Sequence, residues 1–254
     1  MYRPKTTAAP LGQHLLTNPR VAEKVAEAAG AEKNVHVLEI GPGKGMLTRE
    51  LLKRGTIVTA IEKDPNMVSV LHAEFEKEIK NKKLHLIFGD AREVTPDILF
   101  PKGKYVVAAN IPYYITGELI RQFLTAKNQP ASLALLVQKE VAERIARSKK
   151  ESILSLSVKV FGTPRYVDTV KRGNFNPPPK VDSAILAVQD ISRKNLKGIS
   201  EESFFEVVKA GFGQKRKTLA GNLKRALGST LGVAENIRAE DVPLSEWLTI
   251  AARY

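Results

Sequence analysis

The sequence contains no cysteine, and its 254 residues include only one tryptophan and three methionines. The missing thiols exclude disulfides, thiolate zinc sites, iron–sulfur clusters and a cysteine nucleophile, and they suit a reducing compartment. No stretch approaches the roughly 18 apolar residues of a membrane span, and the opening MYRPKTTAAP lacks the apolar run of a secretory signal. We therefore expect a soluble protein of the cytoplasm, and no residue pattern suggests a metal site.

Acidic residues are scarce relative to basic ones. Lysine and arginine number 40 against 27 acids, which gives a formal net charge of +13. Hydrophobic residues make up 43% and charged residues 26%, the usual mix of a folded globular protein. The positive excess favours a polyanionic partner, either a nucleic acid or an anionic membrane surface.

Apolar runs alternate with amphipathic stretches over the first part of the chain. A first helix is predicted through VAEKVAEAAG, with Asn18 as its cap and Gly30 as its stop. The runs predict strands at 35–40, 56–62, 84–88, 104–109 and 132–138, and helices at 45–54, 65–79, 117–126 and 138–147. Helices between apolar strands imply a parallel sheet in an α/β fold. Further along, alternating patterns at 153–162, 165–172 and 181–189 predict antiparallel strands that extend one edge.

The character of the chain changes near residue 190. A polar linker, DISRKNLKGIS, is followed by predicted helices at 201–211, 215–227 and 243–253. Between residues 193 and 225 nine lysines and arginines stand against three acids, a net charge of +6. We therefore divide the chain into a domain at 1–190 and a small helical domain at 191–254.

A glycine-rich turn joins the first predicted strand to a helix. The segment EIGPGKG carries Gly41 and Gly43, which let the backbone turn sharply and let a ligand approach without meeting a Cβ. Glu62 stands 21 positions after Gly41, at the end of the next strand, where an acid can accept hydrogen bonds from ribose hydroxyls. The spacing G-x-G-x-G favours S-adenosylmethionine over a dinucleotide. Asp90, after the third strand, is placed to accept from an adenine amino group.

Asn110, Ile111, Pro112 and Tyr113 follow another strand and so face the same crevice. The amino group of adenine is a poor nucleophile because its lone pair is delocalised into the ring. The side-chain carbonyl of Asn110 and the main-chain carbonyl of Ile111 could each accept one N6 hydrogen and turn that lone pair towards a methyl group. Tyr113 could stack on one face of an extruded base, and Phe175, in the proline-rich loop NFNPPPK, on the other.

Eight segments together resemble the KsgA-type rRNA adenine N6,N6-dimethyltransferases. They are LGQHLL, EIGPGKG, IEKDP, GDA, NIPYY, QKEVAERI, NFNPPPKVDSA and FGQKRKTLAGNL, in the family's order over nearly the whole chain. The resemblance implies a Rossmann-like class I fold dependent on S-adenosylmethionine, with a mostly parallel seven-stranded sheet and a small C-terminal helical domain. It also implies dimethylation of two adjacent adenosines near the 3′ end of small-subunit (16S) rRNA during ribosome biogenesis, by a monomer that needs no metal or membrane.

The same resemblance implies roles for individual residues. The methyl donor is contacted by Gln13, His14, Leu16, Gly41, Gly43, Glu62, Asp90, Ala91 and Asn110. The target adenine meets Asn110, Ile111, Pro112, Tyr113 and Phe175. Two positions depart from the family pattern L-G-Q-N/H-F-L: Leu15 replaces the phenylalanine, and His14 stands where asparagine is common. No general base is required, because the methylated amine becomes acidic once charged and can lose its proton to water.

Five cations close to one another in the C-terminal segment predict contacts with RNA phosphates: Lys215, Arg216, Lys217, Lys224 and Arg225. Two other functions stay open. One is the antibiotic-resistance methyltransferase of large-subunit (23S) rRNA, which shares the donor and base motifs. The other is a non-catalytic RNA-binding assembly factor on the same fold.

Overall fold

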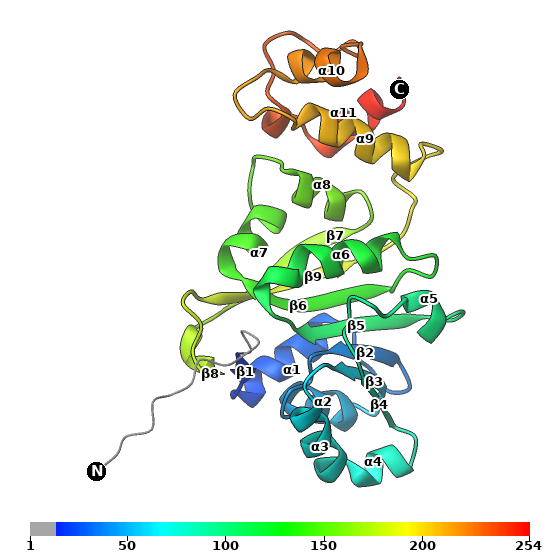
Figure 1. The fold of residues 1–254 in the computed structure, drawn as a ribbon, viewed down its shortest axis with the longest axis vertical. Coiled ribbons are helices and arrows are strands. Elements are labelled where there is room, and N and C mark those ends of the chain that lie inside the picture. The colour runs from blue at the N-terminus through cyan, green and yellow to red at the C-terminus, as the bar shows by residue number, and fades with distance from the viewer. Residues whose placement is uncertain (1–13) are drawn as a thin grey trace.

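A seven-stranded sheet forms the centre of the computed structural model, which describes residues 14–254 (Figure 1). Its strand order is β4-β3-β2-β5-β6-β9-β7. The strands are β2 (His36–Ile40), β3 (Ile57–Glu62), β4 (Leu84–Phe88), β5 (Tyr105–Asn110), β6 (Ser132–Gln138), β7 (Thr163–Val170) and β9 (Ser183–Gln189). The first five in spatial order are parallel, whereas β9 runs antiparallel to both β6 and β7. The predicted parallel sheet with an antiparallel edge is thus confirmed.

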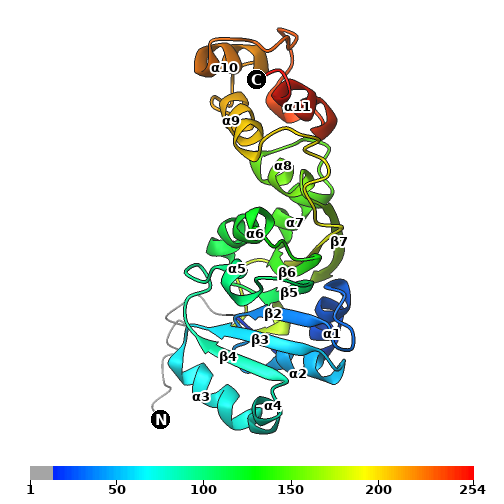
Figure 2. The ribbon, with the colours of Figure 1, turned by 90° about the vertical axis from the view of Figure 1, so that its right-hand side faces the viewer.

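The central strands are continuously apolar because helices cover both faces of the sheet (Figure 2). Neighbouring residues of β5 enter different hydrophobic clusters: Val107 belongs to the cluster with Leu119 and Leu156, and Val106 to the cluster with Val21 and Leu47. The helices of this layered part are α1 (Pro19–Ala28), α2 (Met46–Lys53), α3 (Pro65–Glu74), α4 (Glu76–Lys80), α5 (Pro96–Leu99), α6 (Thr116–Thr125), α7 (Lys139–Ala146) and α8 (Ile153–Lys159). Asn18 caps α1 by accepting from the amide of Arg20, as its sequence predicted.

Two predictions of secondary structure were wrong. The segment at 153–162 was predicted as a strand but forms helix α8, because Ser152 and Ser155 make a reciprocal capping box that starts the helix. The segment at 65–79 was predicted as one helix but breaks at Phe75, where φ is −116° and ψ is 28°. The break lets the buried ring of Phe75 pack under the glycine turn, since a Cβ on Gly45 would lie 2.4 Å from that ring.

A second, two-stranded sheet pairs β1 (Leu15–Leu16) with β8 (Phe175–Asn176) in antiparallel fashion. Leu15 lies opposite Asn176, and Leu16 lies opposite Phe175. Nearby, Asn18 Nδ2 donates to Asn174 Oδ1 at 2.8 Å. This pairing joins the start of the described chain to the proline-rich loop, more than 150 positions later in the sequence.

The remaining helices are α9 (Glu201–Gly211), α10 (Leu219–Leu227) and α11 (Leu244–Ala251). They lie beyond α8, at the end of the molecule opposite α3 and α4 (Figures 1 and 2). The fully buried Trp247 stacks on Phe212, with ring centroids 5.5 Å apart. The Phe161 ring, which follows α8, lies 6.1 Å from the Phe205 ring of α9 and joins the C-terminal helices to the part that contains the sheet. The boundary at residue 190 follows the last strand and stays a prediction, because one hydrophobic cluster runs through both parts.

The predicted helix at 215–227 begins later than expected. Thr218 caps α10 by accepting from the amide of Gly221, so residues 215–217 lie on the preceding turn and not on the helix. Within residues 14–254, no helix is both long enough and apolar enough to cross a membrane.

Candidate functional site

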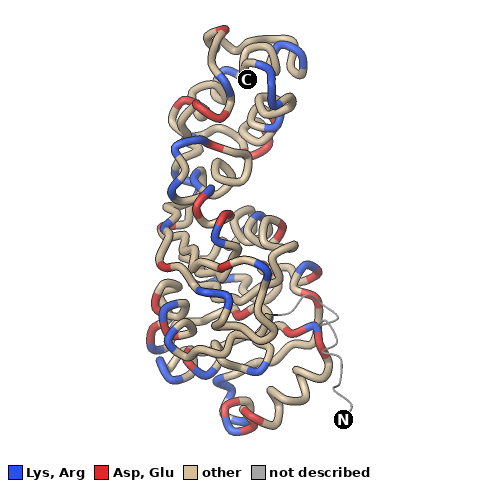
Figure 3. The backbone as a smooth tube through the Cα atoms, turned by 90° about the vertical axis from the view of Figure 1, so that its left-hand side faces the viewer, with Lys and Arg blue, Asp and Glu red and all other residues tan. Residues whose placement is uncertain are grey.

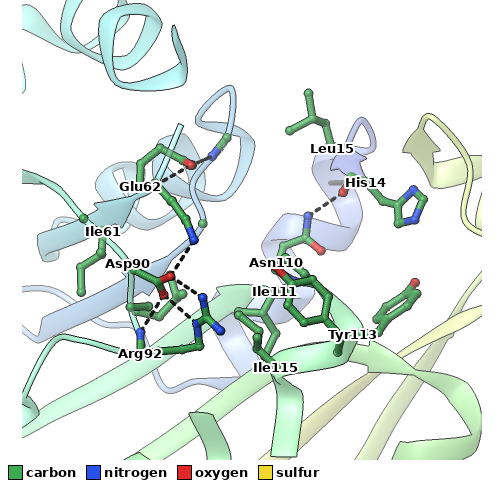
Figure 4. A pocket seen from close by; sticks show the side chains of 18 residues that line it. His14, Leu15, Ile61, Glu62, Asp90, Arg92, Asn110, Ile111, Tyr113 and Ile115 are labelled. Atoms are coloured by element: carbon green, nitrogen blue, oxygen red, sulfur yellow. Dashed lines mark hydrogen bonds and ion pairs between the residues drawn. The ribbon is translucent and has the colours of Figure 1, made fainter. Parts of the chain in front are cut away.

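A pocket opens where β2, β3, β4 and β5 reach their carboxyl ends (Figure 4). The chain leaves β2 towards β3 on one side, whereas β5 lies on the other side, so the pocket stands at the point where the strand order reverses. The residues that line it are His14, Leu15, Ile40, Gly41, Gly43, Ile61, Glu62, Lys63, Gly89, Asp90, Ala91, Arg92, Asn110, Ile111, Pro112, Tyr113, Tyr114 and Ile115.

The glycine turn forms one wall of the pocket. Gly41 and Gly43 have φ angles of 66° and 57°, in the left-handed region that side chains rarely adopt. A Cβ on Gly43 would lie 2.6 Å from Leu15 Cδ2, and one on Gly41 would lie 3.3 Å from the main-chain oxygen of Asn110. The two glycines therefore keep this wall open in the way that the sequence predicted.

Glu62 is 3% exposed and ties the glycine turn to the next loop. Its Oε2 accepts from the amide of Gly43 at 3.0 Å (Figure 4), and its Oε1 accepts from the amides of Lys63 and Asp64 at 2.8 and 2.9 Å. These bonds fix the carboxylate on the pocket wall. Oε2 makes a single bond to a described residue and so retains accepting capacity towards a hydroxyl.

The amide of Asn110 is oriented by the main chain of another segment. Asn110 Nδ2 donates to the carbonyl of His14 at 3.0 Å (Figure 4), which leaves Oδ1 as the atom that can accept hydrogen bonds from a ligand. The His14 ring pairs with the Pro177 carbonyl through Nδ1 at 2.8 Å. The structure thus places His14 beside Asn110 as the residue that orients it.

Tyr113 and Tyr114 begin a short 3-10 helix, η1 (Tyr113–Ile115), at the pocket mouth. The Tyr113 hydroxyl and the Ser183 hydroxyl share a hydrogen bond of 2.7 Å, and burial raises the pKa of this phenol above its usual value. The Tyr113 ring centroid lies 6.0 Å from that of His14. Tyr114 is 69% exposed.

The opposite end of the pocket is built on Asp90, whose carboxylate is held by two cations (Figure 4). Arg92 donates from Nε to Oδ1 at 3.0 Å and from Nη2 to Oδ2 at 2.6 Å, and Lys63 Nζ donates to Oδ2 at 2.8 Å. Arg92 first, and Lys63 after it, hold the pKa of the Asp90 carboxyl well below its ordinary range despite partial burial. The sequence did not point to either cation.

Two predicted site residues lie elsewhere. Phe175 is 4% exposed and packs in the core opposite Leu16, so this structure does not bring it to the pocket as a base-stacking ring. Leu16, predicted to contact the donor, is also buried in that core, and the preceding Leu15 faces the pocket instead. The reason is strand geometry: neighbouring residues of β1 point to opposite sides. Gln13 lies outside the described residues.

The other predicted pocket residues come together as expected: His14, Gly41, Gly43, Glu62, Asp90, Ala91, Asn110, Ile111, Pro112 and Tyr113. The remaining lining residues are apolar wall residues or flank a predicted one: Leu15, Ile40, Ile61, Lys63, Gly89, Arg92, Tyr114 and Ile115. Ile61 and Lys63 flank Glu62 at the carboxyl end of β3, whereas nothing in the sequence indicated that Arg92 would turn back onto Asp90.

Glu39 lies in β2, two positions before Gly41, and is completely buried. Neither of its carboxylate oxygens makes a well-formed hydrogen bond to any residue of the described chain. Burial raises the pKa of Glu39 from 4.5 to about 8, while the nearby Thr48 hydroxyl moderates the rise and the charge of Glu62 adds to it. This carboxyl is therefore neutral over most of the neutral pH range.

A second hollow, of about 630 Å³, lies between the ends of α7 and α8 and the C-terminal helices. Five cations line it: Arg144, Lys150, Lys215, Lys217 and Arg238. Its two acids are engaged, Glu151 by Lys159 and Glu240 by Lys150. In the part of the chain that the structure describes, Lys215, Arg216 and Lys217 form no ion pair, and all three are exposed. We call these three residues the basic turn, and we call the hollow the basic groove. Lys and Arg are frequent along the part of the chain that surrounds the groove (Figure 3).

Comparisons with known proteins show which family this chain resembles. The model of a family described as "Ribosomal RNA adenine dimethylase" matches residues 6–254. A protein of Dehalococcoides mccartyi named ribosomal RNA small subunit methyltransferase A is 39% identical over 96% of this chain and 87% of that protein. One of the same name from Fusobacterium nucleatum is 35% identical over 94% of each chain.

Two solved structures share the fold along almost the entire chain. A dimethyladenosine transferase from Plasmodium falciparum superposes with a TM-score of 0.79 at 29% identity and covers 93% of this chain and 96% of its own. The 23S rRNA methyltransferase ErmE superposes with a TM-score of 0.76 at 26% identity and covers 94% of this chain and 98% of its own.

Proposed function

The chain belongs to the ribosomal RNA adenine dimethylase family, and from this premise we propose that it dimethylates small-subunit rRNA. The reaction transfers methyl groups from S-adenosylmethionine to N6 of two adjacent adenosines near the 3′ end of that RNA, as a step of ribosome biogenesis. The large-subunit alternative is not favoured, because the relatives at 35–39% identity are named for the small subunit. We further propose that the enzyme acts in the cytoplasm, where this RNA is assembled, and as a monomer.

The pocket residues fit the donor. The glycine turn offers a wall that a Cβ would fill, Glu62 supplies an acceptor for ribose hydroxyls, and Asp90 with Ala91 lies where an adenine ring can be recognised. Bound there, S-adenosylmethionine supplies an electrophilic methyl group on a sulfonium. Pocket walls of Ile40, Ile61 and Ile111 exclude water from the apolar parts of such a ligand.

One observation carries the proposal: the hydrogen bond from Asn110 Nδ2 to the His14 carbonyl leaves the side-chain oxygen of Asn110 as an acceptor at the pocket. That oxygen and the carbonyl of Ile111 accept the two N6 hydrogens of the target adenine. Both dipoles then favour the positive charge that develops on nitrogen. Tyr113, held by its bond to Ser183, supports the extruded base.

Proton transfer needs no base from the protein. The pocket places no histidine or carboxylate other than His14, Glu62 and Asp90, and each of these side chains is engaged by a main-chain or cationic partner within the described residues. After methylation the charged nitrogen releases its proton to water. Positioning and dipole stabilisation therefore supply the rate enhancement.

Methylation of purified ribosomal subunits tests the proposal. Small subunits from cells that lack this modification should gain N6,N6-dimethyladenosine, measured by mass spectrometry of nuclease digests, whereas large subunits should gain none. Asn110→Ala should lower the transfer rate by about 10²–10³-fold and leave the dissociation constant of the donor nearly unchanged. Methylation of large subunits alone, or full activity of the variant, contradicts the assignment.

A further inference from the structure

We propose that Arg92 is a latch on the donor site: its guanidinium occupies the Asp90 carboxylate that the adenine amino group of the donor requires, so donor binding must displace it. This inference rests on the proposed function, because it concerns the site where S-adenosylmethionine binds.

Four donors from the chain itself already saturate the Asp90 carboxylate. Its Oδ1 accepts from the main-chain amide and from Nε of Arg92, both at 3.0 Å. Its Oδ2 accepts from Arg92 Nη2 at 2.6 Å and from Lys63 Nζ at 2.8 Å. A carboxylate offers about four lone-pair sites, so an incoming amino group has to replace one of these donors.

Arg92 covers more of this carboxylate than Lys63 does, so its departure frees a site on each oxygen. Its planar fork spans both oxygens of Asp90, whereas Lys63 reaches only Oδ2. The Arg92 side chain is 37% exposed, so it can turn towards solvent, but the Asp90 side chain is 11% exposed and stays on the pocket wall. The main-chain amide bond to Oδ1 is independent of the arginine side chain and continues to orient the carboxylate.

The latch assigns Glu118 as the second acceptor for the released guanidinium. This exposed glutamate stands in the first turn of α6 and forms no ion pair within residues 14–254. After Asp90, the charges of Glu118 and Tyr114 are those that hold the pKa of Arg92 above its ordinary value, so both lie near the arginine. Arg92 therefore has two acceptors, one that excludes the donor and one that does not.

The latch lowers the apparent affinity for the donor. Only molecules in which Arg92 has left Asp90 can bind the adenine amino group, and the observed dissociation constant rises by the reciprocal of their fraction. Removing the latch should raise the affinity for any ligand that carries the adenine amino group. It should not raise the affinity for a ligand in which a carbonyl replaces that group.

Calorimetric titration of the full chain without RNA tests the latch. Arg92→Leu should bind S-adenosylmethionine and S-adenosylhomocysteine about five- to tenfold more tightly than the wild type, a range that corresponds to latch occupancies of roughly 80–90%. Arg92→Gln, which keeps the length of the side chain without its charge, should show a smaller gain and serves as a second variant. Arg121→Leu, at an exposed arginine on α6, is the matched control and should change nothing.

Two further titrations separate a latch from a structural support. S-inosylhomocysteine, which lacks the amino group, should gain no affinity from Arg92→Leu. Glu118→Gln should weaken donor binding in the wild type but have no effect in the Arg92→Leu background. Unchanged or weaker donor binding by both Arg92 variants overturns the latch and makes the arginine a support of Asp90. Failure of the wild-type chain to bind the donor at all removes the proposed function instead.

Discussion

Three polar side chains around the pocket are held in three different ways. Asn110 is fixed by a main-chain carbonyl, Asp90 by two cations, and Glu39 by no described hydrogen-bond partner at all. A buried carboxyl without a partner stays protonated, because ionisation in an apolar surrounding is unfavourable. The ionisation of Glu39 should therefore make the stability of the region beneath the glycine turn depend on pH.

We predict that Glu39→Gln raises stability at neutral pH. The pKa of Glu39 rises from 4.5 to about 8 on folding, so between these values the unfolded chain holds fewer protons than the folded one. The free energy of unfolding of the wild type should therefore fall as pH increases through this window, by at most about 1.4 kcal/mol per pH unit, and level off above it. The glutamine variant keeps the shape and removes this dependence.

Urea unfolding between pH 5 and 9 measures the difference between the two chains. The stability advantage of the glutamine variant should be small near pH 5 and grow towards pH 8. Glu32→Gln, at an exposed position, is the control and should leave the pH profile unchanged. A constant difference across the range would rule out ionisation of Glu39 as its cause.

At the level of single residues, the sequence predicted those side chains whose position follows from a strand end. Glu62, Asp90 and Asn110 all come directly at or after predicted strands, and the parallel sheet brings such positions to one edge. The bond between Arg92 and Asp90 could not be predicted, because a flexible side chain two positions on has many conformations. Phe175 was misplaced because an aromatic ring in a loop packs equally well against a ligand or a core.

Among the elements, the two-stranded sheet of β1 and β8 could not be predicted from the sequence. Strands of two residues show no periodicity, and their pairing joins segments about 160 positions apart. The wrong strand at 153–162 has a related cause: its apolar residues fit a strand and one helix face equally well, and the capping box of Ser152 decides for the helix. Longer strands were all predicted, because apolar runs between helices leave little choice.

A substitution at the contact between β1 and the glycine turn tests how closely these elements fit. Gly43→Ala should weaken donor binding roughly tenfold, because φ is 57° and the new Cβ would lie 2.6 Å from Leu15 Cδ2; left-handed backbone alone costs roughly 1–2 kcal/mol for an alanine. The measurement is the dissociation constant of S-adenosylhomocysteine.

Two variants control this experiment. Leu15→Ala in the same chain should restore part of the affinity, because it relieves the contact and leaves only the backbone strain. Gly117→Ala, where an added Cβ meets no atom within 4 Å, should bind the donor as the wild type does. Equal binding by Gly43→Ala would mean that the turn adapts and does not set the pocket width.

Across the whole molecule, the pocket and the basic groove lie in different parts. The pocket opens at the carboxyl ends of β2–β5, and the groove lies where α7 and α8 meet the C-terminal helices. Net charge and clustered cations predicted a nucleic-acid surface, but the sequence placed the basic turn on a helix. The turn precedes α10, and this lets Lys215 and Lys217 line the groove.

We predict that RNA affinity depends on the basic turn through charge alone. Replacing Lys215, Arg216 and Lys217 by glutamine should reduce the slope of log K against log salt by about 2 to 3, since each lost phosphate contact contributes about 0.7–0.9. Filter binding of small-subunit RNA over a range of salt concentrations measures the slope. Donor affinity in the same variant should stay at the wild-type value.

The matched control removes cations elsewhere on the surface. Lys77, Lys80 and Lys83 lie around α4, at the end of the molecule away from the groove, and their replacement by glutamine removes the same charge. If both triple variants lower the slope equally, net charge and not the basic turn governs RNA binding.

The acceptor that orients Asn110 is the carbonyl of residue 14, a group that every amino acid carries. Exchange of the histidine for asparagine or another residue leaves that oxygen in place, so long as β1 keeps its path. The orientation of the Asn110 side-chain amide therefore does not depend on which side chain stands at residue 14. Natural or engineered diversity at residue 14 is compatible with one unchanged geometry at the reacting nitrogen.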